Sequence, residues 1–176
     1  FTSAVLIEIA TIALAVFVSE TWWNPLVYVI AVVVIGSRIN GLGGLMCDAA
    51  FDEITRPDVL LFPGGIGTRT LITDDAVLDW VREVHRHTVL TTSVCTGSLV
   101  LAAAGLLTGM TATTHWRAAE LLESLGAKYV PQRVVEHVPE RIITAAGVSS
   151  GIDMALRLVE LLVDREAAQA AQLMIE

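Results

Sequence analysis

The feature that most constrains the fold of this chain is an abrupt change of pattern at Cys95. Residues 88–94 form a short run rich in Val and Thr, which is typical of a buried strand. Residues 98–104 are small and mostly apolar and are followed by Gly105, as expected for a helix that ends at a left-handed glycine. A strand that turns directly into a helix leaves the residue at the turn outside both elements, so we expect Cys95 to stand above the edge of a sheet.

The spacing of small residues around this cysteine predicts a reactive turn. Ser93, Cys95 and Gly97 are spaced as in the G-x-S-x-G nucleophile elbow, with cysteine in the place of the nucleophile and serine at the first small position. The dipole and the free N–H groups at a helix N-terminus stabilise a thiolate. We therefore expect a nucleophilic, readily ionised thiol. A lone cysteine is more often a small buried hydrophobe, but the elbow pattern favours the nucleophile.

Residues 51–176 alternate between short apolar runs and helical patterns. We expect strands at residues 58–62, 88–94, 111–115, 129–138 and 141–145, the last two as a hairpin, and helices that begin near residue 73 and at residues 98–104, 117–125, 150–163 and 165–176. Apolar strands that alternate with helices predict an α/β sandwich around a mainly parallel sheet. No repeat or linker is visible, so we treat residues 1–176 as a single domain. In the helix at 150–163 the apolar side is expected to comprise Ile152, Ala155, Leu156, Val159 and Leu162.

Composition limits the classes of function. The formal net charge is −8, Lys128 is the single lysine, and no basic cluster is present, which argues against nucleic acid as a partner. The two cysteines, Cys47 and Cys95, lie far apart and are not part of a CxxC, HExxH or EF-hand pattern. We therefore expect no disulfide framework, no metal and no cofactor, and a reducing, cytoplasmic location.

The first 37 residues have an unusual composition. They contain no Lys or Arg, and Glu8 and Glu20 are their acids. The apolar runs at residues 4–18 and 26–35 are shorter than the about 18 residues that a membrane helix needs, and a signal peptide would have a basic start. We expect buried strands or helices here rather than a membrane segment. A stretch that departs from the natural sequence, for instance through a frameshift, would have the same composition.

Several candidate site residues follow the carboxyl ends of predicted strands, where open α/β sheets bind ligands. The Gly64–Gly65 turn, Cys95 and His115 are all in such positions. We expect the backbone N–H groups of Gly65 and Thr96 to form an oxyanion hole beside the thiol, because glycine lets the backbone approach a reacting atom closely. A plain glycine turn is the alternative for the first pair.

Three further residues complete the candidate site. His115 would either orient or deprotonate the thiol, or tie a strand end to the backbone, and the sequence leaves both possibilities open. Trp116 is expected to line or cover the pocket. Glu8 is an acid inside an apolar run, where burial would favour its protonated form and allow it to donate a proton. The alternative is that Glu8 faces solvent from an edge.

These motifs resemble the ThiJ/PfpI superfamily of class I glutamine-amidotransferase-like proteins. Within it they are most similar to the isonitrile (isocyanide) hydratase branch and to the sensor domain of some AraC-type regulators. The resemblance covers residues 43–176 and is carried by residues 43–51, 58–65, 92–107, 112–116 and 147–156. It implies a flavodoxin-like three-layer sandwich and a homodimer that acts on a small molecule without contacting nucleic acid or membrane. It also implies that the sequence is incomplete at both ends.

The resemblance also implies roles for individual residues. Cys95 would be the nucleophile with Thr96 in its hydrogen-bonding shell, and His115 matches the histidine near the family's cysteine. Proteases of the family have a histidine directly after the cysteine, so Thr96 favours the hydratase branch. The family's acid lies in an Asp-x-x-Gly-Pro segment that this chain lacks, and Glu8 is the nearby acid that would replace it.

The function expected from the sequence is cysteine-dependent addition of water to a small electrophilic carbon, with conversion of an isonitrile into an N-formamide as the specific reaction. Cys95 would attack the terminal carbon and Glu8 would supply the proton. One alternative is the ligand-sensing domain of an AraC-type regulator. The other is a glyoxalase, deglycase or peptidase of the same superfamily, which Thr96 disfavours.

Overall fold

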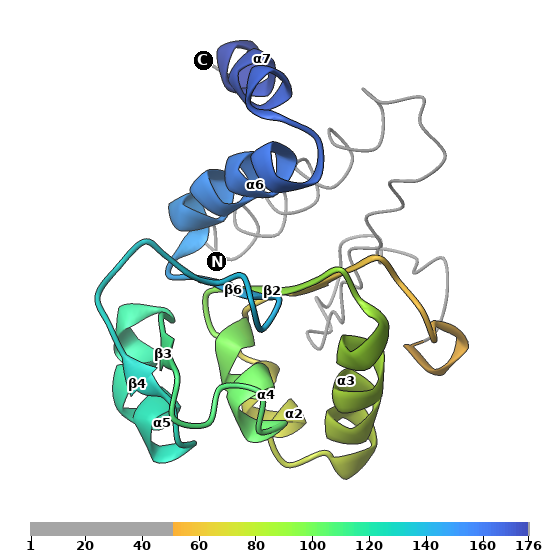
Figure 1. Ribbon diagram of the computed structural model, residues 1–176. Coiled ribbons are helices and arrows are strands. Elements are labelled where there is room, and N and C mark those ends of the chain that lie inside the picture. Colours follow the sequence, from red (N-terminus) through yellow and green to blue (C-terminus); the bar gives the residue numbers. More distant parts are fainter. Residues whose placement is uncertain (1–50, 176) are drawn as a thin grey trace, which may run out of the picture.

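A four-stranded sheet forms the centre of the computed structural model, which describes residues 51–175 (Figure 1). The strand order is β1 (Val59–Phe62), β2 (Leu90–Val94), β6 (Ile142–Ala145) and β5 (Val134–His137). The first three strands are parallel, and β5 runs antiparallel to β6. The mainly parallel sheet predicted from the sequence is therefore confirmed.

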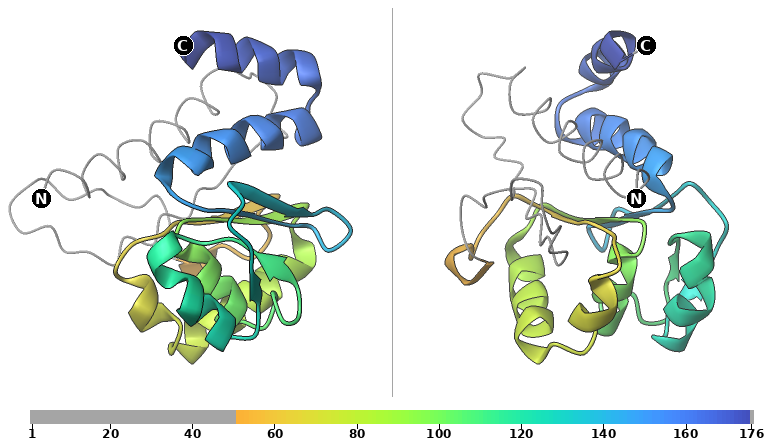
Figure 2. Two further views of the ribbon diagram at one scale, coloured as in Figure 1. Left: turned by 90° about the vertical axis from the view of Figure 1, so that its left-hand side faces the viewer. Right: turned by 180° about the vertical axis from the view of Figure 1, so that it is seen from behind.

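Helices cover both faces of this sheet, so that the fold has three layers (Figure 1). One layer contains α2 (Thr68–Leu71), α3 (Asp75–His87), α4 (Gly97–Ala103) and α5 (Ala119–Ser124). The opposite face is covered by α6 (Val148–Leu162), and α7 (Arg165–Ile175) packs on the outer side of α6, as Figure 2 shows from two further sides. The remaining elements are η1 (Phe51–Glu53), η2 (Trp116–Ala118) and a two-stranded parallel sheet of β3 (Thr111–Ala112) and β4 (Lys128–Tyr129). This arrangement confirms the predicted α/β sandwich.

The sheet is buried on both sides, and alternate residues of each strand enter different cores. On β1, Leu60 and Phe62 pack in the core beneath α3 and α4, whereas Val59 and Leu61 pack in the core beneath α6. Every residue of β1, β2 and β6 is buried, whereas Glu136 on the edge strand β5 is exposed. This explains why β1, β2 and β6 read as runs of apolar residues, threonine and serine in the sequence.

The buried face of α6 differs from the predicted one. Gly151, Met154 and Leu158 are buried, whereas Ile152 is exposed. A Cβ atom at Gly151 would lie 3.2 Å from Cγ1 of Val94 on β2, so the helix sits against the sheet at a point where side chains are small. The prediction was right for Ala155, which is buried, and wrong for Ile152, because the side of α6 that contains Gly151 faces β2 and the next residue, Ile152, lies outside this contact.

The predicted strand at residues 111–115 is also shorter than expected. Only its first two residues are extended, as β3, and they pair with β4 outside the main sheet. The Thr113 N–H donates to the hydroxyl of Thr144 at 3.1 Å, and the Thr113 hydroxyl donates to the Gln132 carbonyl at 2.7 Å. These side-chain bonds replace a strand ladder and bend the segment toward the sheet edge.

A buried hydroxyl in β2 gives a test of the core. Ser93 Oγ is fully buried and has no hydrogen-bond partner among residues 51–175. Since an unpaired buried hydroxyl opposes folding, we predict that Ser93→Ala keeps the free energy of unfolding or raises it by up to about 1 kcal/mol. Thr144→Val, which removes the acceptor of the Thr113 N–H, should lower it by about 1–3 kcal/mol. Urea unfolding followed by tryptophan fluorescence measures both, and a loss above about 1 kcal/mol in Ser93→Ala would contradict the prediction.

Candidate active site

The turn at Cys95 has the geometry of a nucleophile elbow. Cys95 directly follows β2 and lies two residues before α4, and its φ of 57° is in the left-handed region. A non-glycine residue in this region is strained by about 1–2 kcal/mol, so neighbouring contacts must hold it there. The Cys95 N–H donates to the Ala145 carbonyl at 3.0 Å, and the Thr114 hydroxyl donates to the Cys95 carbonyl at 3.0 Å. The elbow predicted from the sequence is thus present.

Two glycines make room for this turn. A Cβ atom at Gly97 would lie 2.1 Å from the Phe62 carbonyl oxygen. Only glycine at this position therefore allows the first turn of α4 to pack against the end of β1. A Cβ atom at Gly64 would lie 2.6 Å from Cβ of Cys95 and 3.0 Å from its sulfur. The loop after β1 is therefore pressed directly against the thiol.

Thr96 joins this loop to the elbow. It is buried, and its hydroxyl accepts a hydrogen bond from the Gly65 N–H at 2.9 Å and donates to the Gly65 carbonyl at 3.1 Å. The Gly65 N–H is consequently engaged, and the expectation that it points toward a reacting atom is not met. The Thr96 N–H is the amide of this pair that lowers the pKa of the Cys95 thiol.

The electrostatic environment of the thiol is mixed. Burial raises the pKa of the half-buried Cys95 thiol, whereas hydrogen bonds from Thr96 and the positive charge of Arg69 lower it, and burial is the larger effect. The Thr96 hydroxyl has one proton, which serves either Gly65 or the thiolate, so we attribute the stabilising bond to the Thr96 N–H. The predicted ready ionisation is therefore opposed by desolvation. Arg69, on α2, was missed because no motif marks it, although it follows the Gly64–Gly65 turn closely.

His115 and Trp116 form a stacked pair next to the elbow. His115 Nδ1 accepts a hydrogen bond from the Arg117 N–H at 3.3 Å, and the two rings stack with centroids 5.7 Å apart. The Arg117 guanidinium lies 5.5 Å from the centre of the Trp116 ring. Within residues 51–175 no hydrogen bond joins His115 to Cys95. Of the two roles expected for His115, the structure shows the hydrogen bond to the backbone, here to the Arg117 N–H.

The structure thus brings Gly64, Gly65, Cys95 and Thr96 together and adds Thr114, which sequence reasoning missed because a buried threonine in a β-branched run carries no distinctive signal. Glu8 and Cys47 lie outside the described residues. Among residues 51–175 there is no cluster of three or more His, Cys, Asp or Glu that could hold a metal ion. In the same part of the chain, every helix is too short or too polar to cross a membrane.

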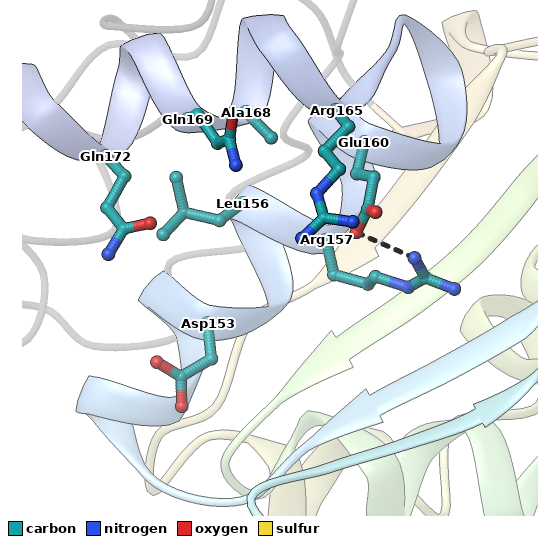
Figure 3. Close-up of a pocket in the computed structure, with 8 residues that line it drawn as sticks. All are labelled: Asp153, Leu156, Arg157, Glu160, Arg165, Ala168, Gln169 and Gln172. Carbon is teal, nitrogen blue, oxygen red and sulfur yellow. Dashed lines mark hydrogen bonds and ion pairs between the residues drawn. The ribbon is translucent and has the colours of Figure 1, made fainter.

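A cavity of about 410 Å³ lies elsewhere, between α6 and α7 (Figure 3). Its lining is largely polar and charged: Asp153, Leu156, Arg157, Glu160, Arg165, Ala168, Gln169 and Gln172. Arg157 is paired with Glu136 and Glu160, and Asp153 is paired with Arg133. None of the residues that contact Cys95 lines this cavity, so we place the candidate active site at the elbow.

Comparison with known proteins identifies relatives of this chain. Residues 11–161 match the family described as the DJ-1/PfpI family. Isonitrile hydratase of Pseudomonas putida is 45% identical over 126 residues, which are 72% of this chain and 54% of that protein. The HTH-type transcriptional regulator CdhR of Pseudomonas aeruginosa is 36% identical over 121 residues, which are 68% of this chain and 35% of that protein. The crystal structure of a ThiJ/PfpI family protein from Pseudomonas syringae is 40% identical with a TM-score of 0.65, over 70% of this chain and 51% of that chain. The chain therefore spans about half the length of the first of these relatives and about a third of the second.

The close approach of Gly64 predicts a loss of thiol reactivity on a small substitution. Gly64→Ala would force a Cβ atom against Cys95, and the elbow or the loop would have to move. We expect the rate of Cys95 alkylation by iodoacetamide to fall at least about tenfold, in line with the sensitivity of reacting groups to small displacements. Gly147→Ala is the matched control, because no atom lies within 4 Å of a Cβ added there. Equal rates in the two variants would contradict the prediction.

Arg69 should affect ionisation of the thiol. Its positive charge lowers the Cys95 pKa, so Arg69→Gln should raise that pKa and move the pH profile of iodoacetamide alkylation toward higher pH. The rate at neutral pH should fall accordingly. Arg86→Gln removes the same charge from the last turn of α3, which precedes the start of β2, whereas Cys95 follows the end of β2. This variant should leave the profile unchanged. A profile that is the same in wild type and Arg69→Gln would show that the guanidinium does not act on the thiol.

Proposed function

The chain belongs to the DJ-1/PfpI family, and from this premise we propose that it is an isonitrile hydratase-like enzyme with Cys95 as its nucleophile. The observation that carries the proposal is the elbow itself: a cysteine held at a left-handed turn, with a backbone N–H on its sulfur. The 45% identity to isonitrile hydratase supports water addition to an isonitrile over the other activities considered. Thr96, in the position where the related proteases have histidine, supports the same choice.

In the proposed reaction the Cys95 thiolate attacks the terminal carbon of the isonitrile and forms a C–S bond. An acid delivers a proton to that carbon, which gives a thioimidate. Water then adds to the C=N carbon, and one of its protons passes to the nitrogen. The new hydroxyl group returns its proton to the acid as the C–S bond breaks, which releases the N-formamide and the thiolate. The sum is addition of one water molecule to the isonitrile.

The chain's own residues would divide this work. The Thr96 N–H would stabilise the thiolate, both before attack and when it leaves, and Gly65 would hold Thr96 through the paired hydrogen bonds to its hydroxyl. Gly64 would keep the loop close to the reacting atom without blocking it. Glu8 stays our candidate for the acid, and His115 and Trp116 are assigned to substrate positioning. We also propose that the protein acts as a homodimer.

The decisive variant is Cys95→Ala. Without the sulfur no C–S bond can form, so the formyl proton of N-benzylformamide should not appear in NMR spectra of benzyl isonitrile incubated with the variant. The wild type should produce it, and Glu8→Gln should slow its appearance if Glu8 is the acid. Urea unfolding should show that Cys95→Ala is folded. Full turnover by a folded Cys95→Ala protein would overturn the mechanism.

The similarity to CdhR favours a second candidate, a ligand-sensing domain of a transcription regulator. A sensor needs a pocket but no turnover. If the wild type produced no formamide, while small ligands raised its melting temperature equally in wild type and Cys95→Ala, the sensor function would be supported instead.

A further inference from the structure

Two exposed apolar side chains flank the elbow. Ile66 is 77% exposed and Trp116 is 72% exposed. Each lies two residues along the chain from a residue that contacts Cys95, Ile66 after Gly64 and Trp116 after Thr114. Two residues span at most about 7 Å, so both residues lie close to the elbow. Exposed apolar groups on both sides of a nucleophile are unfavourable in water and indicate contact with a ligand or a partner.

The tryptophan is fixed before any ligand arrives. Its ring is stacked against His115 and lies beneath the Arg117 guanidinium, and the His115 ring is itself tied to the Arg117 N–H. A side chain already held in one orientation loses little conformational entropy when a ligand packs on it. Exposure combined with such local fixation is typical of a recognition surface rather than of a loose loop tip.

We propose that Ile66 and Trp116 form an apolar rim that selects substrates by the organic group that carries the reactive function, and that His115 is the positioning residue that orients Trp116. That the reactive function is an isonitrile rests on the proposed function. The half-buried thiol admits a narrow, linear electrophilic group, while the rim contacts the bulky apolar body that remains outside. Substrates with an aryl or cycloalkyl group should therefore react faster than small ones.

The test uses Cys95 alkylation and so does not depend on hydratase activity. Iodoacetamide and N-benzyl iodoacetamide carry the same reactive group and differ in the apolar body. The wild type should react faster with the benzyl compound. Trp116→Ala and Ile66→Ser should each lose most of this preference, measured as the ratio of the two rates, by roughly tenfold for a lost apolar contact. Leu173→Ala, which shortens a side chain on α7 that is 74% exposed, is the matched control and should keep the preference.

Two kinds of outcome would overturn the proposed role of the rim. One concerns the preference for the benzyl compound: the wild type shows none, or Trp116→Ala and Ile66→Ser leave it intact. The other is a change of molecular mass in Trp116→Ala on gel filtration together with an altered rate for plain iodoacetamide, which would assign the rim to contact between two copies of the chain. If the protein failed to hydrate isonitriles but showed the preference, the proposed function would fall and the rim would stand.

His115 is tested with two substitutions. His115→Phe retains an aromatic ring for stacking and should keep most of the preference, whereas His115→Ala should reduce it as Trp116→Ala does. A base for the thiol would behave differently, since His115→Phe would then slow alkylation by plain iodoacetamide and change its pH profile. That result would overturn the positioning role.

Discussion

The α-carbon of Gly97 packs against the Phe62 carbonyl oxygen so closely that a Cβ atom would lie 2.1 Å away. This contact sets the position of α4 against the carboxyl end of β1. Cys95, between β2 and α4, then has no room for an ordinary conformation and takes a left-handed one. Two distant residues hold it there, through the Ala145 carbonyl and the Thr114 hydroxyl, together with the hydroxyl of Ser98 in the first turn of α4. The strain of the turn is balanced by bonds that also fix the sheet edge.

The same packing creates a conflict at the thiol. Bringing Cys95 under the Gly64 loop shields its sulfur from water and raises its pKa, which opposes formation of the nucleophile. The Thr96 N–H and the Arg69 charge act in the other direction but do not cancel burial. A thiol that holds its proton at rest is less exposed to unwanted electrophiles and oxidants, because the thiolate is the reactive form. If the Cys95 thiol ionised only when a substrate was bound at the rim, only a recognised substrate would meet the reactive thiolate.

The strands β1 and β2, the elbow and the helix after it could be predicted because each depends on a local pattern of neighbouring residues. The contacts that failed prediction join distant parts of the chain. Thr96 and Gly65 are 31 residues apart, and nothing in either segment shows that the Thr96 hydroxyl engages the Gly65 N–H. The buried face of α6 was misplaced for a similar reason, since the fit of Gly151 against Val94 is a property of two surfaces. Arg69 acts on the thiol through space and has no motif at all.

Enzyme and sensor place different demands on the same elbow. A sensor requires a shaped pocket, for which a strained turn and a desolvated thiol bring no benefit, and glycine at that position would relieve both. An enzyme requires the nucleophile to face the reacting atom, and the strain of a left-handed cysteine is then part of its function. The structure keeps the costly arrangement: the left-handed φ, the two glycines that permit it and the amide on the sulfur. For this reason we keep chemistry at Cys95, rather than binding alone, as our proposal.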